Sequence, residues 1–150
     1  MKKIINLKEK YRTEVVPEME RIFKYGNHLA VPKIKKVVLN VGIGKISKED
    51  AKVSEVESSL AEITGQKTIK TKARKAIAGF KIRQGQEVGV AVTLRKEKMW
   101  AFIERLVNTS LPRIRDFQGI DQKAIDNGGN LNIGIKEHMV FPEIVPEKVK

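Results

Sequence analysis

The chain begins with apolar residues at helical spacing. These residues are Leu7, Tyr11, Val15, Met19, Ile22 and Phe23. Their spacing predicts an amphipathic helix over residues 6–24, with a break near Gly26. Pro17 lies inside the pattern, so we expect a kink at that position.

A second helix is predicted between residues 47 and 65. Ser47 and Asp50 are placed like the two ends of a capping box, and Gly65 suits a left-handed C-terminal cap. The apolar positions between them, which should be buried, are Val53, Val56, Leu60 and Ile63. A short strand over residues 67–71 and a glycine-containing basic loop over residues 72–85 are expected to follow.

Two strands are predicted to have faces of different kinds. Residues 34–41 alternate between Val37, Leu39 and Val41 on one face and Lys36, Val38 and Asn40 on the other. Residues 87–95 alternate between Val88, Val90, Val92 and Leu94 and the set Gly89, Ala91, Thr93 and Arg95. If helices cover the aliphatic faces, the second faces are open, and small side chains let a bulky ligand approach the backbone. An ordinary solvated face is the alternative, but such a face favours longer and more charged residues.

The last third of the chain predicts one more helix and one more strand. Apolar positions at Met99, Phe102, Ile103, Leu106 and Val107 indicate a helix that ends before Pro112. Residues 112–130 predict an exposed loop with a turn at 126–130, and residues 131–135 a final strand. The order of elements predicts an α+β fold, with an antiparallel or mixed sheet covered by helices on one face. No repeat or linker divides residues 1–150, so we expect a single domain.

Positive charge is concentrated in the middle of the chain. The 150 residues include 30 Lys and Arg and 18 Asp and Glu, a net charge of +12. Residues 65–98 hold 10 basic and 2 acidic side chains, so two thirds of the excess lies there. The centre of this segment has no carboxylate among seven cations, which are Lys67, Lys70, Lys72, Arg74, Lys75, Lys81 and Arg83. Because such a run repels itself, it favours a polyanionic partner over a merely solvated face.

The sequence shows no convincing motif for catalysis, cofactor binding or a membrane span. The absence of cysteine excludes disulfides and thiolate metal sites, and His28 and His138 lie 110 positions apart. Gly42 and Gly44 lack the remaining residues of a nucleotide-binding motif. Glu97 and Glu104 are interpreted as exposed helix residues rather than an acid–base pair. No apolar run approaches the roughly 18 residues of a membrane span. We therefore expect a soluble, cytoplasmic, non-catalytic protein without a cofactor.

The few aromatic residues favour one kind of nucleic-acid recognition. The chain has 5 Phe, 2 Tyr and 1 Trp, and most of them fall at core-like positions. Readers of single strands stack bases on exposed aromatic side chains. Contacts to the sugars, phosphates and groove shape of a structured RNA fit this chain better.

Several motifs together resemble one family. They are Thr64-Gly-Gln-Lys67, Thr71-Lys-Ala-Arg-Lys75, Ala78-Gly-Phe-Lys-Ile-Arg-Gln-Gly85, Pro112-Arg-Ile-Arg-Asp-Phe117 and Phe141-Pro-Glu-Ile144. In this order they resemble the bacterial 5S-rRNA-binding proteins of the large ribosomal subunit, the L-five family, over essentially the whole chain. Members of that family usually continue past the residues matching Glu147 and Lys148 with a further strand and a helix, whereas this chain ends at Lys150.

The resemblance implies three surfaces. A 5S rRNA site on the open sheet face and adjoining turns would comprise Lys36, Asn40, Gln66, Lys67, Thr71, Thr93 and Arg95. A protruding basic loop that reaches P-site tRNA would present Arg74, Lys75, Phe80, Lys81 and Arg83. A bridge to protein thirteen of the small-subunit head would use Arg113, Arg115, Asp116 and Phe117. The implied location is the central protuberance of the cytoplasmic ribosome, beside 23S rRNA and neighbouring proteins.

Two other functions are compatible with the composition. An architectural DNA- or RNA-binding protein outside the ribosome would explain the charge, but no recognition helix or zinc-finger pattern is present. An RNA-processing enzyme would need clustered His or acidic residues near the basic segment, where only Glu87 and Glu97 occur.

Overall fold

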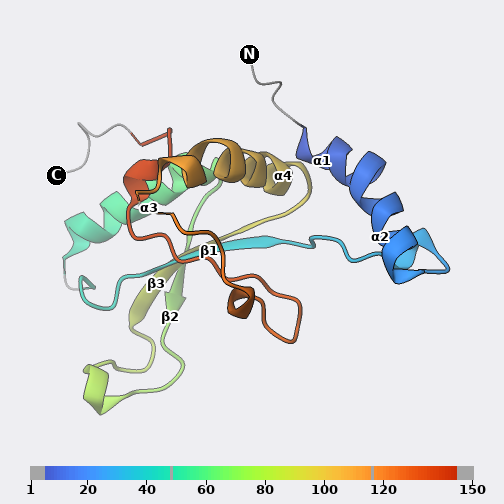
Figure 1. Ribbon diagram of the computed structural model, residues 1–150. Helices are drawn as coiled ribbons and strands as arrows, with labels where there is room; N and C mark the ends of the chain where they lie inside the picture. The colour runs from blue at the N-terminus through green and yellow to red at the C-terminus, as the bar shows by residue number, and fades with distance from the viewer. Residues whose placement is uncertain (1–5, 48, 116, 145–150) are drawn as a thin grey trace.

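A three-stranded antiparallel sheet organises the molecule. The computed structural model describes residues 6–47, 49–115 and 117–144. The strands β1 (Val37–Gly42), β2 (Ile69–Lys72) and β3 (Glu87–Leu94) lie in the order β1–β3–β2. The helices α3 (Asp50–Thr64) and α4 (Lys96–Arg105) lie on one face of the sheet (Figure 1). The predicted α+β architecture is confirmed, and all strand pairs are antiparallel.

The register of the strands determines which residues share a face. In the β1–β3 pair, Asn40 is opposite Ala91, and in the β2–β3 pair Thr71 is opposite Gly89. Directly opposed residues point to the same side of a sheet. Along β1, half-buried and exposed residues alternate as the sequence predicts. The strand begins three residues later than expected, at Val37 instead of at position 34.

The core lies between the sheet and the two covering helices. It contains the aliphatic face of β3, the inner stripes of α3 and α4, and a segment near the C-terminus. Its buried members are Ile43, Val53, Leu60, Ile63, Val90, Val92, Leu94, Met99, Phe102, Val140, Phe141 and Ile144. Burial of each such side chain contributes about 1.5–3 kcal/mol. The predicted inner face of α3 is confirmed, with Val56 half-buried at the margin. Of the apolar positions predicted for the last helix, four contact the core, but Val107 is 44% exposed.

The prediction for α3 is wrong at its N-terminal end and correct at its C-terminal end. The N-cap is Glu49, whose side chain makes no capping hydrogen bond, so the prediction of Ser47 as the cap is wrong. The Ser47 hydroxyl instead donates to the carbonyl of Gly44 (3.2 Å) and accepts from the side chain of Gln86 (3.0 Å). At the other end Gly65 adopts the expected left-handed conformation, with φ of 60°.

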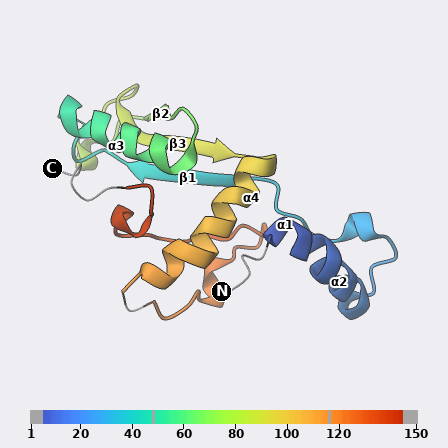
Figure 2. The same ribbon diagram turned by 90° about the horizontal axis from the view of Figure 1, so that it is seen from above.

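The first helical segment is irregular and partly solvent-exposed. It consists of α1 (Leu7–Lys10), a π-helical turn (Tyr11–Val15) and α2 (Val16–Phe23), and Pro17 is the second residue of α2. The segment ends at Phe23, close to the predicted end at residue 24, and Lys24 caps it in a left-handed conformation with φ of 52°. No residue of α2 is buried, although its apolar residues recur at helical spacing. Figure 2 shows the reason, since α2 extends beyond the sheet and its covering helices.

The polypeptide after α4 departs from the sequence prediction in two places. It stays helical through a π-helical turn (Leu106–Ser110) and a 3₁₀ turn (Leu111–Arg113), so the helical path does not end before Pro112. Proline is tolerated there because the first residues of a helical turn need no N–H donor. The predicted strand over 131–135 is absent; Leu131 forms only an isolated bridge with Ile125. This bridge closes the predicted turn at 126–130, and the segment makes a small local loop instead of joining the sheet.

Candidate nucleic-acid interface

The sheet face opposite the helices carries small and polar side chains at its centre. Asn40 on β1 and Thr71 on β2 are exposed and stand on either side of Gly89 of β3. A Cβ atom added to Gly89 would lie 2.6 Å from the Thr71 hydroxyl oxygen and 3.3 Å from the Asn40 side-chain oxygen. Gly89 itself is buried, so the two polar side chains cover the β3 backbone at this point, and they fit there because position 89 has no side chain.

Gln66 joins this face from the turn that follows α3. Its side-chain amide donates to the backbone carbonyl of Thr93 over 3.2 Å. The turn is held from α4, because the Lys98 ammonium donates to the carbonyl of Gly65 (3.0 Å) and the Arg105 guanidinium to that of Ile63 (3.1 Å). Two predicted site residues that are 27 positions apart in sequence thus meet through a direct hydrogen bond.

Cations lie at one end of the same face. The Val37–Leu94 pair ends the β1–β3 ladder, Lys36 directly precedes it and Arg95 directly follows it, and both are exposed. Lys67 is exposed in the turn next to Gln66. All seven residues of the predicted 5S rRNA site are therefore on the open face, at this end of it or in the adjoining turn. Positively charged side chains at the edge and uncharged groups at the centre suit an anionic polymer better than a small molecule.

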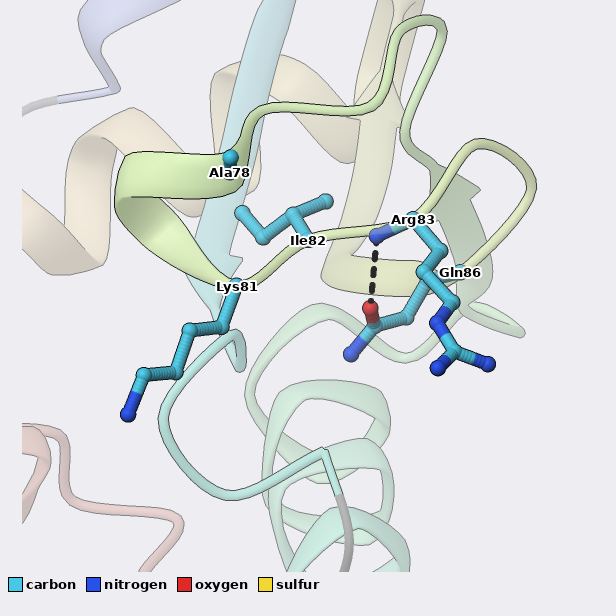
Figure 3. A pocket seen from close by; sticks show the side chains of 5 residues that line it. All are labelled: Ala78, Lys81, Ile82, Arg83 and Gln86. Carbon is cyan, nitrogen blue, oxygen red and sulfur yellow. Dashed lines mark hydrogen bonds between the residues drawn. The ribbon is translucent and has the colours of Figure 1, made fainter.

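The loop between β2 and β3 is an ordered projection. The backbone N–H of Ala73 donates to the Gln86 carbonyl, and Ile77 pairs with Ile82 across the loop. The Gln86 side chain accepts from the Arg83 N–H (3.1 Å; Figure 3) and donates to Ser47, which ties the base of the loop to the β1–α3 connection. Figure 1 shows the loop extending away from the helices.

The projecting loop presents its predicted contact residues to solvent. Arg74, Lys75, Lys81 and Arg83 are exposed, and Phe80 is 74% exposed. Lys81 follows a 3₁₀ turn (Ala78–Phe80) and is left-handed, with φ of 55°. An exposed aromatic ring among unshielded cations can make stacking and phosphate contacts at the same time.

One cation of the central basic run is neutralised by the fold. The Lys70 ammonium pairs with Glu57 of α3 (3.2 Å) and with Glu87 of β3 (3.3 Å). These hydrogen bonds, first that of Glu57 and then that of Glu87, raise the pKa of Lys70. The expectation of seven cations without counter-charges is therefore wrong for this residue, because both carboxylates lie outside the run in sequence.

The predicted bridge residues begin at Arg113, the last residue of a 3₁₀ turn. Arg113 and Arg115 are exposed and Phe117 is 42% exposed, while Asp116 lies outside the described residues. Ile114 between the arginines packs against the core cluster. This contact holds the exposed side chains on the surface of the main body.

A second carboxylate-free run escaped the sequence prediction. Residues 21–48 contain seven Lys and Arg and no Asp or Glu. Counting charge over residues 1–64 conceals it, because residues 49–64 are acidic. The same region carries the exposed Phe23, which helical spacing had assigned to the core. A charge count over shorter windows would have found this segment.

Metal-binding clusters and membrane-spanning helices are absent from the part of the chain that the structure describes. No group of three or more His, Asp or Glu side chains in residues 6–47, 49–115 and 117–144 could hold a metal ion. None of the described helices is both long and apolar enough to cross a membrane. The exposed Glu97 pairs with Lys8 of α1 instead of with a second carboxylate. The fold and surface define an α+β protein whose open sheet face and cationic projections suit a large anionic partner.

Comparison with known proteins identifies the family. The family model described as ribosomal protein L5 matches residues 27–83, and the model of the C-terminus of the same ribosomal family matches residues 87–150. The large ribosomal subunit proteins uL5 of Geotalea uraniireducens and Halothermothrix orenii are each 50% identical over 143 residues, which cover 95% of this chain and 80% of each relative. That of Geobacter sulfurreducens is 47% identical over the same coverage.

The chain therefore belongs to the ribosomal protein L5 family. The family resemblance predicted from the sequence motifs is confirmed. As a member of this family, the chain is a structural protein of the large ribosomal subunit. The family is a family of ribosomal structural proteins and not of enzymes. The expected location on the bacterial ribosome is confirmed by the same relatives.

Proposed function

We propose that the open sheet face binds 5S rRNA and anchors it in the central protuberance of the large subunit. The observation that supports this most directly is the pair of exposed polar side chains, Asn40 and Thr71, that lie over the buried Gly89 on the face opposite the helices. A ribose or phosphate can approach such a surface closely. Side-chain amides and hydroxyls then determine the register of the RNA without reading base identity.

Electrostatic attraction would come from the end of the face. Lys36, Lys67 and Arg95 would neutralise phosphates, and each contact releases a counterion. Binding should therefore weaken as salt concentration rises, while the polar contacts at Asn40, Gln66 and Thr93 persist. This division separates residues that attract the RNA from residues that orient it.

The projecting loop is proposed to contact the P-site tRNA. Its support is the exposure of Phe80 together with the cations Arg74, Lys75, Lys81 and Arg83 at a distance from the sheet face. A loop with internal hydrogen bonds loses little conformational entropy when a partner docks. We further propose that Arg113, Arg115, Asp116 and Phe117 face protein thirteen of the small-subunit head, and that 23S rRNA and other proteins of the central protuberance adjoin the chain.

The sheet-face proposal is tested by Asn40→Glu in a filter-binding assay with 5S rRNA. A carboxylate on this face should repel phosphates and lower affinity about a hundredfold, equivalent to about 3 kcal/mol. Ser58→Glu is the matched control, because Ser58 is exposed on α3 in the helical layer. Equal affinity of the Asn40 variant and the wild type would refute the site.

The loop proposal is tested separately. The double variant Lys81→Gln/Arg83→Gln should leave 5S rRNA affinity within about twofold and weaken tRNA binding to large subunits that contain it. A large loss of 5S rRNA affinity would show that the loop belongs to the 5S rRNA site.

A further inference from the structure

The N-terminal segment forms an arm that is attached to the main body at its base. We define the arm as residues 7–35 and its tip as residues 21–30. At the base, the Tyr11 ring packs on that of Trp100 (5.6 Å between centroids), and the Tyr11 hydroxyl donates to the Pro32 carbonyl (2.8 Å). Both views of the ribbon show α2 standing clear of the sheet (Figures 1 and 2). The base is thus well anchored, and the tip is presented to solvent.

The tip exposes large apolar side chains. Ile22 is 57%, Phe23 59% and Leu29 72% exposed. The Phe23 ring lies 5.8 Å from that of Tyr25, with 36° between their planes. Asn27 caps the following turn by accepting from the Leu29 N–H (2.9 Å). A locally ordered cluster of this kind on a surface marks an interaction site.

The charge around this cluster has one sign. Residues 21–36 contain Arg21, Lys24, Lys33, Lys35 and Lys36 and no carboxylate. Among the described residues, Arg21 alone of these five has a carboxylate within 4.0 Å, that of Glu18 at 3.6 Å. A second copy of the chain would bring an equally cationic tip against this one, which like-charge repulsion opposes. The charge complements a polyanion.

The tip repeats a local structure found in the projecting loop. Phe23 ends α2 and is followed by left-handed Lys24, with φ of 52° and ψ of 41°. Phe80 ends a 3₁₀ turn and is followed by left-handed Lys81, with φ of 55° and ψ of 34°. In both places an exposed phenylalanine is the last residue of a helical segment, and a left-handed lysine directly follows it. This combination suits a base stacked on the ring with its phosphate near the lysine.

We propose that the arm tip is a second RNA-binding surface, separate from the sheet face, that takes an unpaired RNA segment. A base stacks on Phe23, Lys24 contacts the phosphate next to it, and Lys33 and Lys35, on the segment that returns to the main body, contact phosphates further along the same RNA strand. The inference goes beyond the sheet-face site and rests on its own observations. Single-stranded or looped RNA is the class indicated, because a base inside a duplex does not offer its face to a protein ring.

The test measures fluorescence anisotropy of a short labelled oligoadenylate titrated with the full chain. Phe23→Leu keeps an apolar side chain and removes the ring, so affinity should fall about tenfold. Phe117→Leu, which removes another exposed ring, should leave it unchanged. Lys33→Gln should reduce the slope of log affinity against log salt by about 0.7. Thermal unfolding verifies that each variant is folded.

Two further measurements distinguish this surface from the sheet face. Photo-crosslinking of a thiouridine-containing oligonucleotide should label the peptide that contains Phe23. Asn40→Glu should lower 5S rRNA affinity about a hundredfold and leave oligonucleotide affinity intact, whereas Phe23→Leu should lower oligonucleotide affinity about tenfold and leave 5S rRNA affinity intact. Unchanged oligonucleotide affinity in Phe23→Leu overturns the proposal, as does a loss confined to 5S rRNA. The proposal is also overturned if the arm binds a protein partner and no oligonucleotide.

Discussion

The side chain of Gln66 donates a hydrogen bond to the backbone carbonyl of Thr93 over 3.2 Å. This contact connects the turn after α3 to β3, so the helical layer positions part of the candidate RNA surface. The Gly65 carbonyl just before Gln66 accepts from Lys98 of α4. Packing between the helices is thereby coupled to the geometry of the sheet face.

Replacing Gln66 should affect stability and RNA binding together. Gln66→Met keeps the length of the side chain but removes the donor, so unfolding free energy should fall by about 1 kcal/mol. The affinity for 5S rRNA should fall about tenfold, because the turn with Lys67 loses its attachment. Urea unfolding and filter binding measure the two effects. Gln84→Met, at an exposed position of the projecting loop, should change neither.

A methyl group at position 89 should strain the centre of the sheet. Gly89→Ala is expected to cost about 1–3 kcal/mol, because its Cβ would overlap the Thr71 hydroxyl. In a Thr71→Ala background the cost should shrink, which a double-mutant cycle detects by urea unfolding. Gly42→Ala is the matched control, since Gly42 is opposite Gly89 and has open space around its added Cβ. Equal costs in both backgrounds would mean that Thr71 is not the obstacle.

Lys67 and Lys70 should respond differently to salt although they are close in sequence. Lys67 is exposed beside the candidate site, whereas Lys70 is paired with Glu57 and Glu87. Lys67→Gln should reduce the slope of log 5S rRNA affinity against log salt by about 0.9, as expected for one lost phosphate contact. Lys70→Gln should leave the slope unchanged. Equal slopes for the two variants would contradict the assignment of Lys70 to the fold.

Acid should weaken the turn at residues 126–130. Hydrogen bonds from the side chain and the backbone N–H of Asn130, with a smaller one from Gly128, hold the pKa of Asp126 below its ordinary value of 3.8. The ionised carboxylate therefore stabilises the turn above pH 3.8, and this contribution is lost as the pH falls through the lowered pKa. Asn130→Ala should return the pKa of Asp126 toward 3.8 in a carboxyl NMR titration. A titration curve unchanged by this substitution would contradict the assigned cause.

Features that depend on neighbouring residues in the chain were predictable. Alternation separated Asn40 and Thr93 from the aliphatic face because successive side chains of a strand point to opposite sides. Gly65 was predictable as a helix end because only glycine readily adopts the left-handed conformation. The motifs of the family were also readable, since they are contiguous in sequence. These elements needed no knowledge of strand order.

Features that depend on distant residues required the tertiary structure. The local sequence makes Ser47 a plausible helix cap. In the structure its hydroxyl instead accepts a hydrogen bond from the side chain of Gln86, which is 39 positions away. Phe23 has helical spacing suited to a core, but α2 extends past every layer that could cover it. Local sequence determined which faces are apolar and where cations lie. The tertiary structure decided which faces are covered and which cations remain unpaired, because burial and ion pairing depend on chain segments that only folding brings together.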